Sequence, residues 1–355
     1  MNKPIFMAMV GAPGSGKSAY AAQYAGECNV EVFSSDSYRK KILGDEGDQS
    51  ANGKIFDELY KDLIFALRDG RNCILDATNC TLKDRLRVMN RLSGVPCFKI
   101  AAVMSTDPET CIKRDEGREE RQVGKEVILK FVRNFTFPQL WEGWDRVYVQ
   151  GYDTDLPPRL NEKAVGGMLS QMRGFKQKTP HHDYDLLTHS EKLAENYRED
   201  PVLYRAALAH DFGKTIPWDW LVKPEEGVRR YPHHAHIGAY YLLQNLEVFE
   251  GNSWEDIYES MFYVSYHMDA RRWNDSPETR EKYEKLVGKE RFEKMMEFIR
   301  FDELACGNGD HKYHAEISKK IKEGYYLAHS EEVGMDEENK VEEGTDGCGD
   351  DSVSV

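Results

Sequence analysis

Two groups of residues in this sequence have the types and spacing that phosphorus chemistry requires. The first is the run GAPGSGKS at residues 11–18, which matches the pattern G-x-x-x-x-G-K-S/T at every fixed position. Glycines let backbone N–H groups surround phosphate oxygens, and a helix beginning here adds partial positive charge. We expect Lys17 to contact the outer phosphates of a nucleoside triphosphate and Ser18 to ligate Mg²⁺. The predicted phosphate-binding residues are Gly11, Gly14, Ser15, Gly16, Lys17 and Ser18.

Residues that could act on a phosphate acceptor follow two apolar segments. Asp36 comes just after residues 30–34, and Arg39 lies three residues further on, so both would share one face of a helix. We expect Asp36 to accept a proton from an attacking hydroxyl and Arg39 to bind a phosphate; the alternative role for Asp36 is a helix cap. Asp76 could orient a Mg²⁺-bound water or Arg39, or be a turn carboxylate.

Arg114 and Arg118 form a further candidate pair. Residues four apart share a helical face, and two guanidinium groups there could neutralise the charge on a transferred phosphoryl group. Acidic residues lie between and beside them, so a solvated helix of mixed charge is the alternative.

The second group is rich in histidine, because eight of the 11 histidines lie between His181 and His267. Its most informative piece is the string HDFGK at residues 210–214, which follows a segment of small apolar residues. Neutral imidazoles and carboxylates suit divalent ions such as Mn²⁺, Fe, Ni²⁺, Co²⁺ or Mg²⁺. Further candidate ligands within helix-like surroundings are His189, His234, His267 and Asp302.

The elements that must position these residues differ between the two halves. Apolar segments at 5–10, 30–34, 73–76, 98–104 and 146–149 alternate with helical periodicity, which predicts an α/β domain with a parallel sheet. After the run GYDTDLPP, typical of a linker, the pattern is helical. We therefore expect an α/β domain at 1–152, a linker at 153–174, an all-α domain at 175–330 and a tail at 331–355.

Composition limits the protein's class and surroundings. Of the formal net charge of -14, about two thirds lies in the tail, which holds ten acidic residues and one lysine and is predicted to be disordered. Seven scattered cysteines without a Cys-x-x-Cys pair argue against disulfides and thiolate zinc. No apolar run approaches membrane-spanning length, so we expect a cytoplasmic protein without a membrane partner.

Residues 5–150 resemble the polynucleotide 5′-kinase family of bacteriophage-type end-healing enzymes. The resemblance rests on GAPGSGKS, Asp36 with Arg39, the run LDATN at 75–79, the arginine pair and the run EGWD at 142–145. It implies that Asp36 is the general base, Arg39 contacts a phosphate of the acceptor strand, and Arg114 and Arg118 are lid arginines on ATP. Ser37 departs from the family, where many members carry a second acidic residue.

Residues 175–310 resemble the HD phosphohydrolase superfamily. The resemblance implies that His189, His210, Asp211 and Asp302 hold one metal, and that His234 and His267 complete a second site bridged by Asp211. Lys214, with Arg271 or Arg272, could hold a phosphate. Neighbouring residues leave alternatives open: His181 or His182 for His189, and His233 or His236 for His234.

The two resemblances together predict a bifunctional end-healing enzyme for RNA or DNA. It would use ATP and Mg²⁺ to phosphorylate 5′-hydroxyl ends, and a divalent transition metal to remove 2′,3′-cyclic phosphates or 3′-phosphates. The first alternative is a nucleoside or nucleotide kinase fused to a nucleotide phosphohydrolase. The second is a kinase with a non-catalytic sensing domain.

Overall fold

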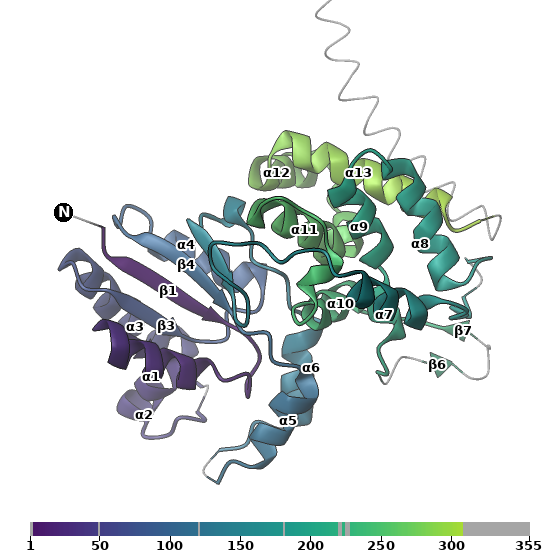
Figure 1. The fold of residues 1–355 in the computed structure, drawn as a ribbon. Coiled ribbons are helices and arrows are strands. Elements are labelled where there is room, and N and C mark those ends of the chain that lie inside the picture. Colours follow the sequence, from purple (N-terminus) through teal and green to yellow (C-terminus); the bar gives the residue numbers. More distant parts are fainter. Residues whose placement is uncertain are drawn as a thin grey trace, which may run out of the picture.

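The apolar segments of the N-terminal half form one parallel sheet (Figure 1). The computed structural model describes residues 3–48, 50–119, 121–179, 182–218, 222–223 and 228–307. The strands are β1 (Ile5–Val10), β2 (Glu31–Ser34), β3 (Cys73–Asp76), β4 (Phe98–Val103) and β5 (Arg146–Val149). They lie in the order β2-β3-β1-β4-β5, and every neighbouring pair is parallel. The predicted strands differ from these by one residue at most.

The central strand β1 is buried on both faces, as a parallel sheet covered by helices requires. Phe6, Ala8 and Val10 face one apolar core, whereas Met7 and Met9 face the other. Helix α1 covers the side of Met7 and Met9, and helices α3 and α4 cover the opposite side. The helices of this domain are α1 (Lys17–Cys28), α2 (Ser35–Leu43), α3 (Asn52–Arg68), α4 (Leu82–Arg91), α5 (Pro108–Glu116) and α6 (Lys125–Arg133), followed by the 3-10 turn η1 (Leu140–Glu142).

Helices dominate the C-terminal half. They are α7 (Glu162–Met172), α8 (Leu186–Ala194), α9 (Pro201–Ala209), α10 (His234–Leu242), α11 (Trp254–Ala270), α12 (Pro277–Val287) and α13 (Lys289–Leu304), with 3-10 turns η2 (Glu195–Tyr197), η3 (Phe212–Thr215) and η5 (Leu246–Val248). The segment expected as a linker contains α7, whose Val165, Met168 and Met172 are buried. A short antiparallel pair, β6 (Val222–Lys223) and β7 (Val228–Arg229), was not predicted. The acidic segment 331–355 lies outside the described residues.

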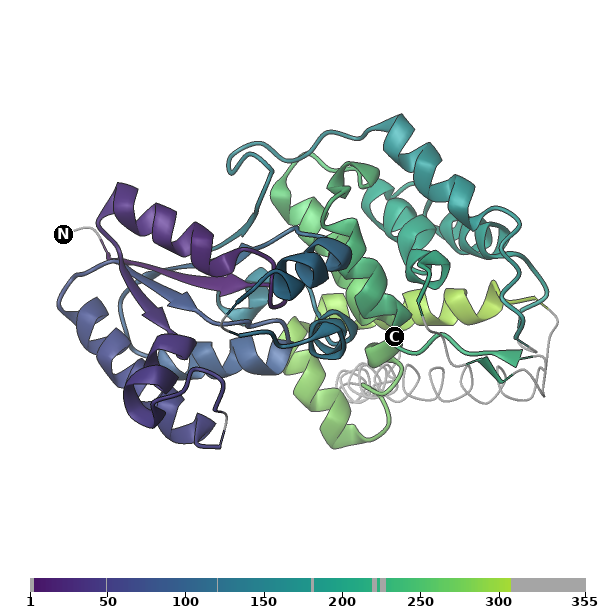
Figure 2. The same ribbon diagram turned by 90° about the horizontal axis from the view of Figure 1, so that it is seen from below.

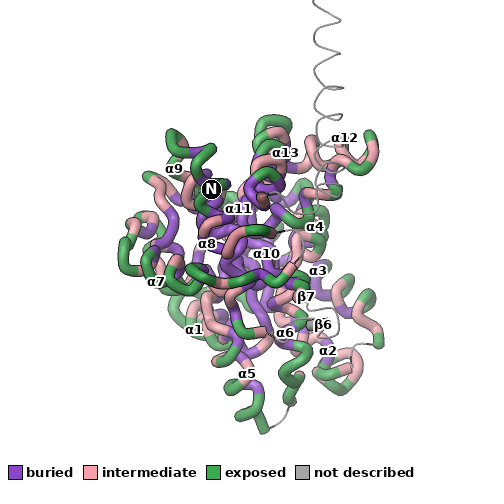
Figure 3. Tube along the Cα trace, turned by 90° about the vertical axis from the view of Figure 1, so that its right-hand side faces the viewer, coloured by how far each residue is buried: buried purple, intermediate pink, exposed green. Residues whose placement is uncertain are grey.

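The two domains pack against each other along residues 135–149 of the first and α10 and α11 of the second (Figures 1 and 2). The ring of Phe135 meets that of Tyr240 edge-on, with centroids 5.2 Å apart. The Gln139 side chain donates to the carbonyl of Tyr258, whose hydroxyl donates to the carbonyl of Val147. One apolar core therefore continues through both domains, and Figure 3 shows α10 and α11 largely buried within it. No helix of the described residues is both long and apolar enough to cross a membrane.

A fully buried ion pair lies beside this boundary. The guanidinium of Arg85, on α4, donates to both carboxylate oxygens of Glu142 at 2.6 and 2.7 Å. Trp144 also donates to Glu142, and Thr136 accepts from Arg85. The EGWD run thus contributes a buried acceptor that ties α4 to η1.

Replacing Glu142 with alanine should destabilise the protein by about 3–5 kcal/mol, because it leaves the Arg85 charge buried without its partner. Urea unfolding monitored by circular dichroism measures this change. The matched control is Glu126→Ala, because the Glu126 side chain is 76% exposed beside Arg133. This substitution should lower the free energy of unfolding by less than about 1 kcal/mol. Equal midpoints for the two variants would contradict the structural role of Glu142.

Candidate active sites

The phosphate loop lies between β1 and α1, and its residues Gly14, Gly16, Lys17 and Ser18 line one pocket. Gly14 has φ +81°, and a Cβ there would lie 2.3 Å from the Cys111 carbonyl oxygen, so the close approach of α5 to the loop requires glycine. The Lys17 ammonium donates to the Ala12 carbonyl at 2.8 Å. Burial lowers the pKa of Lys17, and the nearby Asp76 opposes that shift.

A pocket of about 440 Å³ brings the predicted residues of this domain together. Its walls include Gly14, Gly16, Lys17, Ser18, Asp36, Arg39, Asp76, Arg114 and Arg118. Asp76 ends β3 and Asp36 follows β2, so both reach the edge at which the parallel strands end. Ser15, by contrast, has a buried side chain within the loop.

Asp36 is held by two guanidinium groups. Arg39 pairs with one carboxylate oxygen, and the Nη1 of Arg121 lies 3.0 Å from the other. Arg39 is largely buried and also donates to the side chain of Asn52. The spacing of Asp36 and Arg39 on one helix was predictable, whereas the contact with Arg121 depends on how the segment after α5 folds back over α2.

The arginine pair differs from the single helical face that its spacing predicts. Helix α5 ends at Glu116 with Gly117 as its C-cap, so Arg118 lies beyond the helix. Arg114 donates to the Gly14 carbonyl at 3.4 Å, and Arg118 lies 3.5 Å from Asp115. Both still line the pocket, because the chain turns back after Gly117.

In the helical domain, the six candidate metal ligands lie on or beside six elements and converge. They are His189 on α8, His210 at the end of α9, Asp211 just before η3, His234 at the start of α10, His267 on α11 and Asp302 on α13. All six are at most 5% exposed. Gly213 allows this convergence, since a Cβ there would lie 2.0 Å from the His234 carbonyl oxygen.

The carboxylate of Asp211 lies between two groups of imidazoles. Its Oδ2 is 3.5 Å from the Nε2 of His189 and 3.3 Å from that of His210. Its Oδ1 is 2.9 Å from the Nε2 of His234 and 3.8 Å from that of His267. One carboxylate therefore faces two adjacent sites with different oxygens, as a bridging ligand must.

Asp302 completes the first of these sites. Its Oδ1 lies 3.0 Å from the Nε2 of His189 and 3.3 Å from the Nε2 of His210. Its Oδ2 accepts from Arg271 at 2.8 Å, and Arg271 also pairs with Glu303. Arg271 thus holds the candidate ligand Asp302 in place, and its predicted contact with a substrate phosphate stays a prediction.

Three imidazoles have their Nδ1 atoms committed to backbone carbonyls three residues earlier. The pairs are His210 with Ala207, His234 with Tyr231 and His267 with Val264, at 2.7, 2.8 and 3.0 Å. A carbonyl only accepts, so each Nδ1 carries the proton and each Nε2 presents a lone pair to the cluster. The Nε2 atoms of His234 and His267 lie only 3.1 Å apart, and the buried Nε2 atoms of His189 and His210 have no hydrogen-bond partner among the described residues. Divalent ions fit this donor set, because they bind converging lone pairs that would otherwise repel each other.

Lys214 lies at the edge of the cluster rather than free in a pocket. Its ammonium donates to Asp211 Oδ2 at 2.6 Å and to the Gln177 side chain at 2.9 Å. Burial alone would raise the pKa of Asp211, but His210, Lys214 and His234 together hold it well below its ordinary value. Gln177 was not predicted, since nothing in its sequence surroundings marks it.

The neighbouring histidines take other places. His182 packs against His189 with ring centroids 5.0 Å apart, and His182, His189 and Cys306 form a further group of possible ligand atoms. His233 is exposed, and His236 contacts the Arg133 carbonyl and Asp269 at the domain boundary. Of the three histidines at 233–236, His234 is thus the one in the cluster; His181 lies outside the described residues.

Family comparisons match the two domains separately. Residues 6–138 match the model of the AAA domain, and residues 181–333 match that of the HD domain. The chain joins a P-loop kinase-type domain to an HD domain. The predicted order of a parallel α/β domain and a helical HD domain is confirmed. The kinase-type domain implies ATP and Mg²⁺, and HD domains bind divalent metals.

Comparison with solved structures found partial similarities. The chain is 24% identical to a chain in the structure of the Pnkp1/Rnl/Hen1 RNA repair complex, over 38% of its own length and 44% of that chain, with a TM-score of 0.35. A gluconokinase from Sinorhizobium meliloti is 14% identical, covering 42% and 82% of the two chains at a TM-score of 0.30. A shikimate kinase from Acinetobacter baumannii is 15% identical, covering 37% and 76% at 0.27. Less than half of the repair-complex chain is thus spanned, and comparison with curated proteins yields no match.

Proposed function

We propose that this protein repairs broken nucleic-acid strands at both kinds of end. In this proposal the kinase-type domain transfers the γ-phosphate of ATP to a 5′-hydroxyl, and the HD domain hydrolyses a 2′,3′-cyclic phosphate or a 3′-phosphate. The observation that carries it is the number of cationic side chains in the kinase pocket: five arginines and Lys17 line about 440 Å³.

These cations fall into two groups that suit two phosphate-bearing ligands. Arg114 contacts the phosphate loop itself, and Lys17 belongs to it, so both are placed for ATP. Arg39 and Arg87 come from α2 and α4, across the pocket. A simple nucleoside acceptor needs no such cations, whereas a strand end carries a phosphate next to its 5′-terminal nucleoside.

Asp36 is the group that would accept the proton of the attacking hydroxyl. Its carboxylate is 49% exposed in the pocket, while Arg39 and Arg121 hold both of its oxygens. These pairs hold the Asp36 carboxylate in place until the acceptor enters. The acceptor hydroxyl then competes for one oxygen, loses its proton to Asp36 and attacks the phosphorus as the bond to ADP breaks.

In the HD domain, the proposed ligands are His189, His210 and Asp302 for one ion, His234 and His267 for a second, and Asp211 for both. Divalent ions there supply a bound water of lowered pKa and positive charge for the attacking and leaving oxygens. Backbone carbonyls hold three of these imidazoles by hydrogen bonds, so the chain itself sets the orientation of three proposed ligands. Mn²⁺, Ni²⁺, Co²⁺ and Fe all suit imidazole and carboxylate ligands.

One assay distinguishes the proposed end-healing activity from a nucleoside kinase and from a kinase with a sensing domain. The substrate is an RNA oligonucleotide with a 5′-hydroxyl and a 2′,3′-cyclic phosphate, incubated with labelled ATP, Mg²⁺ and, separately, each transition metal. We expect label at the 5′ end in every reaction and loss of the cyclic phosphate only with a suitable transition metal. Label on free nucleosides but not on the oligonucleotide would favour a nucleoside kinase. An HD domain that retains metal but hydrolyses neither the RNA nor a generic phosphodiester would favour a sensing role.

A further inference from the structure

A groove leads away from the kinase pocket and across the domain boundary. The kinase pocket shares Arg87 with a neighbouring pocket of about 560 Å³, formed by α4 and α12. That pocket in turn shares Leu82, Lys83 and Tyr283 with a third one of about 530 Å³ between the two domains. The three pockets therefore adjoin one another along α4, and we call the path that they form the α4–α12 groove.

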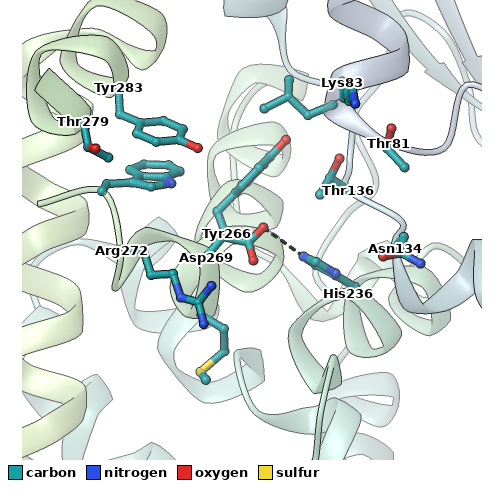
Figure 4. Close-up of a pocket in the computed structure, with 13 residues that line it drawn as sticks. Thr81, Lys83, Asn134, Thr136, His236, Tyr266, Asp269, Arg272, Thr279 and Tyr283 are labelled. Atoms are coloured by element: carbon teal, nitrogen blue, oxygen red, sulfur yellow. Dashed lines mark hydrogen bonds and ion pairs between the residues drawn. The ribbon is translucent and has the colours of Figure 1, made fainter. Parts of the chain in front are cut away.

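The walls of the α4–α12 groove come from both domains. Figure 4 shows its boundary pocket, with Thr81, Lys83, Asn134 and Thr136 on one side, Thr279, Tyr283 and Arg272 on the other, and the hydroxyl of Tyr266 pointing between them. The rings of Tyr283 and Trp273 are stacked with centroids 4.6 Å apart. The ammonium of Lys282 lies 5.0 Å from the centre of the Tyr283 ring. Amide and hydroxyl groups therefore line the boundary pocket together with apolar side chains and the partly exposed ring of Tyr283.

The groove is basic in a protein whose net charge is -14. Lys83, Arg272 and Lys282 are exposed, and none of them pairs with a carboxylate among the described residues. In the two pockets beyond the kinase pocket, the described walls contain one acidic residue, Asp269, and it contacts His236. Asp84, in the kinase pocket, accepts a hydrogen bond from Thr81 and lies 3.5 Å from Arg87. Uncommitted positive charge is thus concentrated along this path.

We propose that the α4–α12 groove binds the single-stranded nucleic acid whose 5′ end enters the kinase pocket. The inference rests on the proposed function and extends it, because it assigns a path for the nucleotides beyond the reacting one. Lys83 and Arg87 lie one turn apart on α4, about 6 Å along the helix axis, which suits successive backbone phosphates. Lys282 and Arg272 would face the strand from the HD side, where the Lys282 ammonium lies over the ring of Tyr283 and could turn toward a backbone phosphate.

A protein partner would be a poorer occupant of this groove. Leu82, Leu86 and Leu286 form a short apolar stretch of its wall. The three exposed cations, which pair with no carboxylate among the described residues, match a polyanion better than they match a neutral protein surface. Strand binding in the groove also explains how an acidic protein could hold a nucleic acid, since contacts are local rather than global.

The test compares a groove variant with a matched surface variant. The groove variant combines Lys83→Glu with Arg272→Glu, and the control combines Lys61→Glu with Lys285→Glu, so each changes one exposed residue per domain. Substrates are a 5′-hydroxyl dinucleotide and an oligonucleotide of about twelve nucleotides, a length that a strand-binding groove can hold. Both kinase KM and binding, measured by fluorescence anisotropy at two salt concentrations, are determined after circular dichroism has verified folding.

We expect the groove variant to raise KM and Kd for the oligonucleotide by about tenfold or more and to reduce the salt dependence of binding. Its kcat and its KM for the dinucleotide should match those of the wild type. The control variant should change KM and Kd by no more than about twofold for either substrate. An oligonucleotide KM and Kd unchanged in the groove variant would overturn the inference. If the wild type binds the oligonucleotide through the groove but never phosphorylates it, the groove stands and the proposed kinase activity fails.

Discussion

Replacing Asp211 with asparagine should abolish phosphoester hydrolysis while leaving phosphoryl transfer from ATP intact. The two oxygens of Asp211 face different imidazole groups, so this one carboxylate contributes to both proposed ion sites. An amide keeps the shape but loses the negative charge and one acceptor oxygen. Supporting groups around metal sites typically contribute 10- to 100-fold, and we expect a bridging ligand to contribute more than about a hundredfold.

Three measurements check this result. Cyclic-phosphate hydrolysis should fall by more than about a hundredfold, bound transition metal per chain should drop, and 5′ phosphorylation should stay within about twofold. Asp275→Asn is the control, because Asp275 is an exposed residue of the same domain and undergoes the same chemical change. Hydrolysis that persists within tenfold in the Asp211 variant would show that the cluster is not the hydrolytic site.

Replacing Lys17 with alanine should have the opposite effect, removing kinase activity and sparing hydrolysis. The ammonium now donates to the Ala12 carbonyl, inside the pocket that holds Asp36 and the arginines. ATP would draw this ammonium to its outer phosphates, where charge grows as the phosphoryl group moves. Loss of one such preorganised donor costs about 10²–10³ in kcat.

Single-turnover phosphorylation of a 5′-hydroxyl oligonucleotide measures this loss directly. Lys61→Ala serves as the comparison, since the Lys61 side chain is 74% exposed on the same domain. Both variants should hydrolyse the cyclic phosphate at the wild-type rate. Loss of both reactions in a folded Lys17 variant would show that the two sites are coupled. The contact between Tyr240, on α10, and Ala12, in the phosphate loop, connects the two domains and could transmit such coupling.

Several features were predictable because they depend on short stretches of chain. A parallel strand buried on both faces is a largely apolar run, so the bounds of β1 and β3 follow from residue types alone. The phosphate loop needs only its own glycines and the helix after it. Asp36 and Arg39 likewise meet because both lie on α2.

Other features depend on contacts between distant segments. The four-residue spacing of Arg114 and Arg118 predicts one helical face, but α5 ends just before Gly117, so Arg118 lies outside the helix. The contact of Arg121 with Asp36, and the burial of Arg85 on Glu142, join residues that no local spacing relates. The α4–α12 groove exists only because the two domains pack together.

By itself, the order of residues determined the parallel α/β fold, the helical second half, the phosphate loop and the identity of the histidines and acids that could bind metal. The tertiary structure decided which of the neighbouring histidines point inward and which oxygen of Asp211 each of them faces. The reason is physical: residue type sets what a side chain can bind, whereas packing of separate helices sets where its lone pairs point.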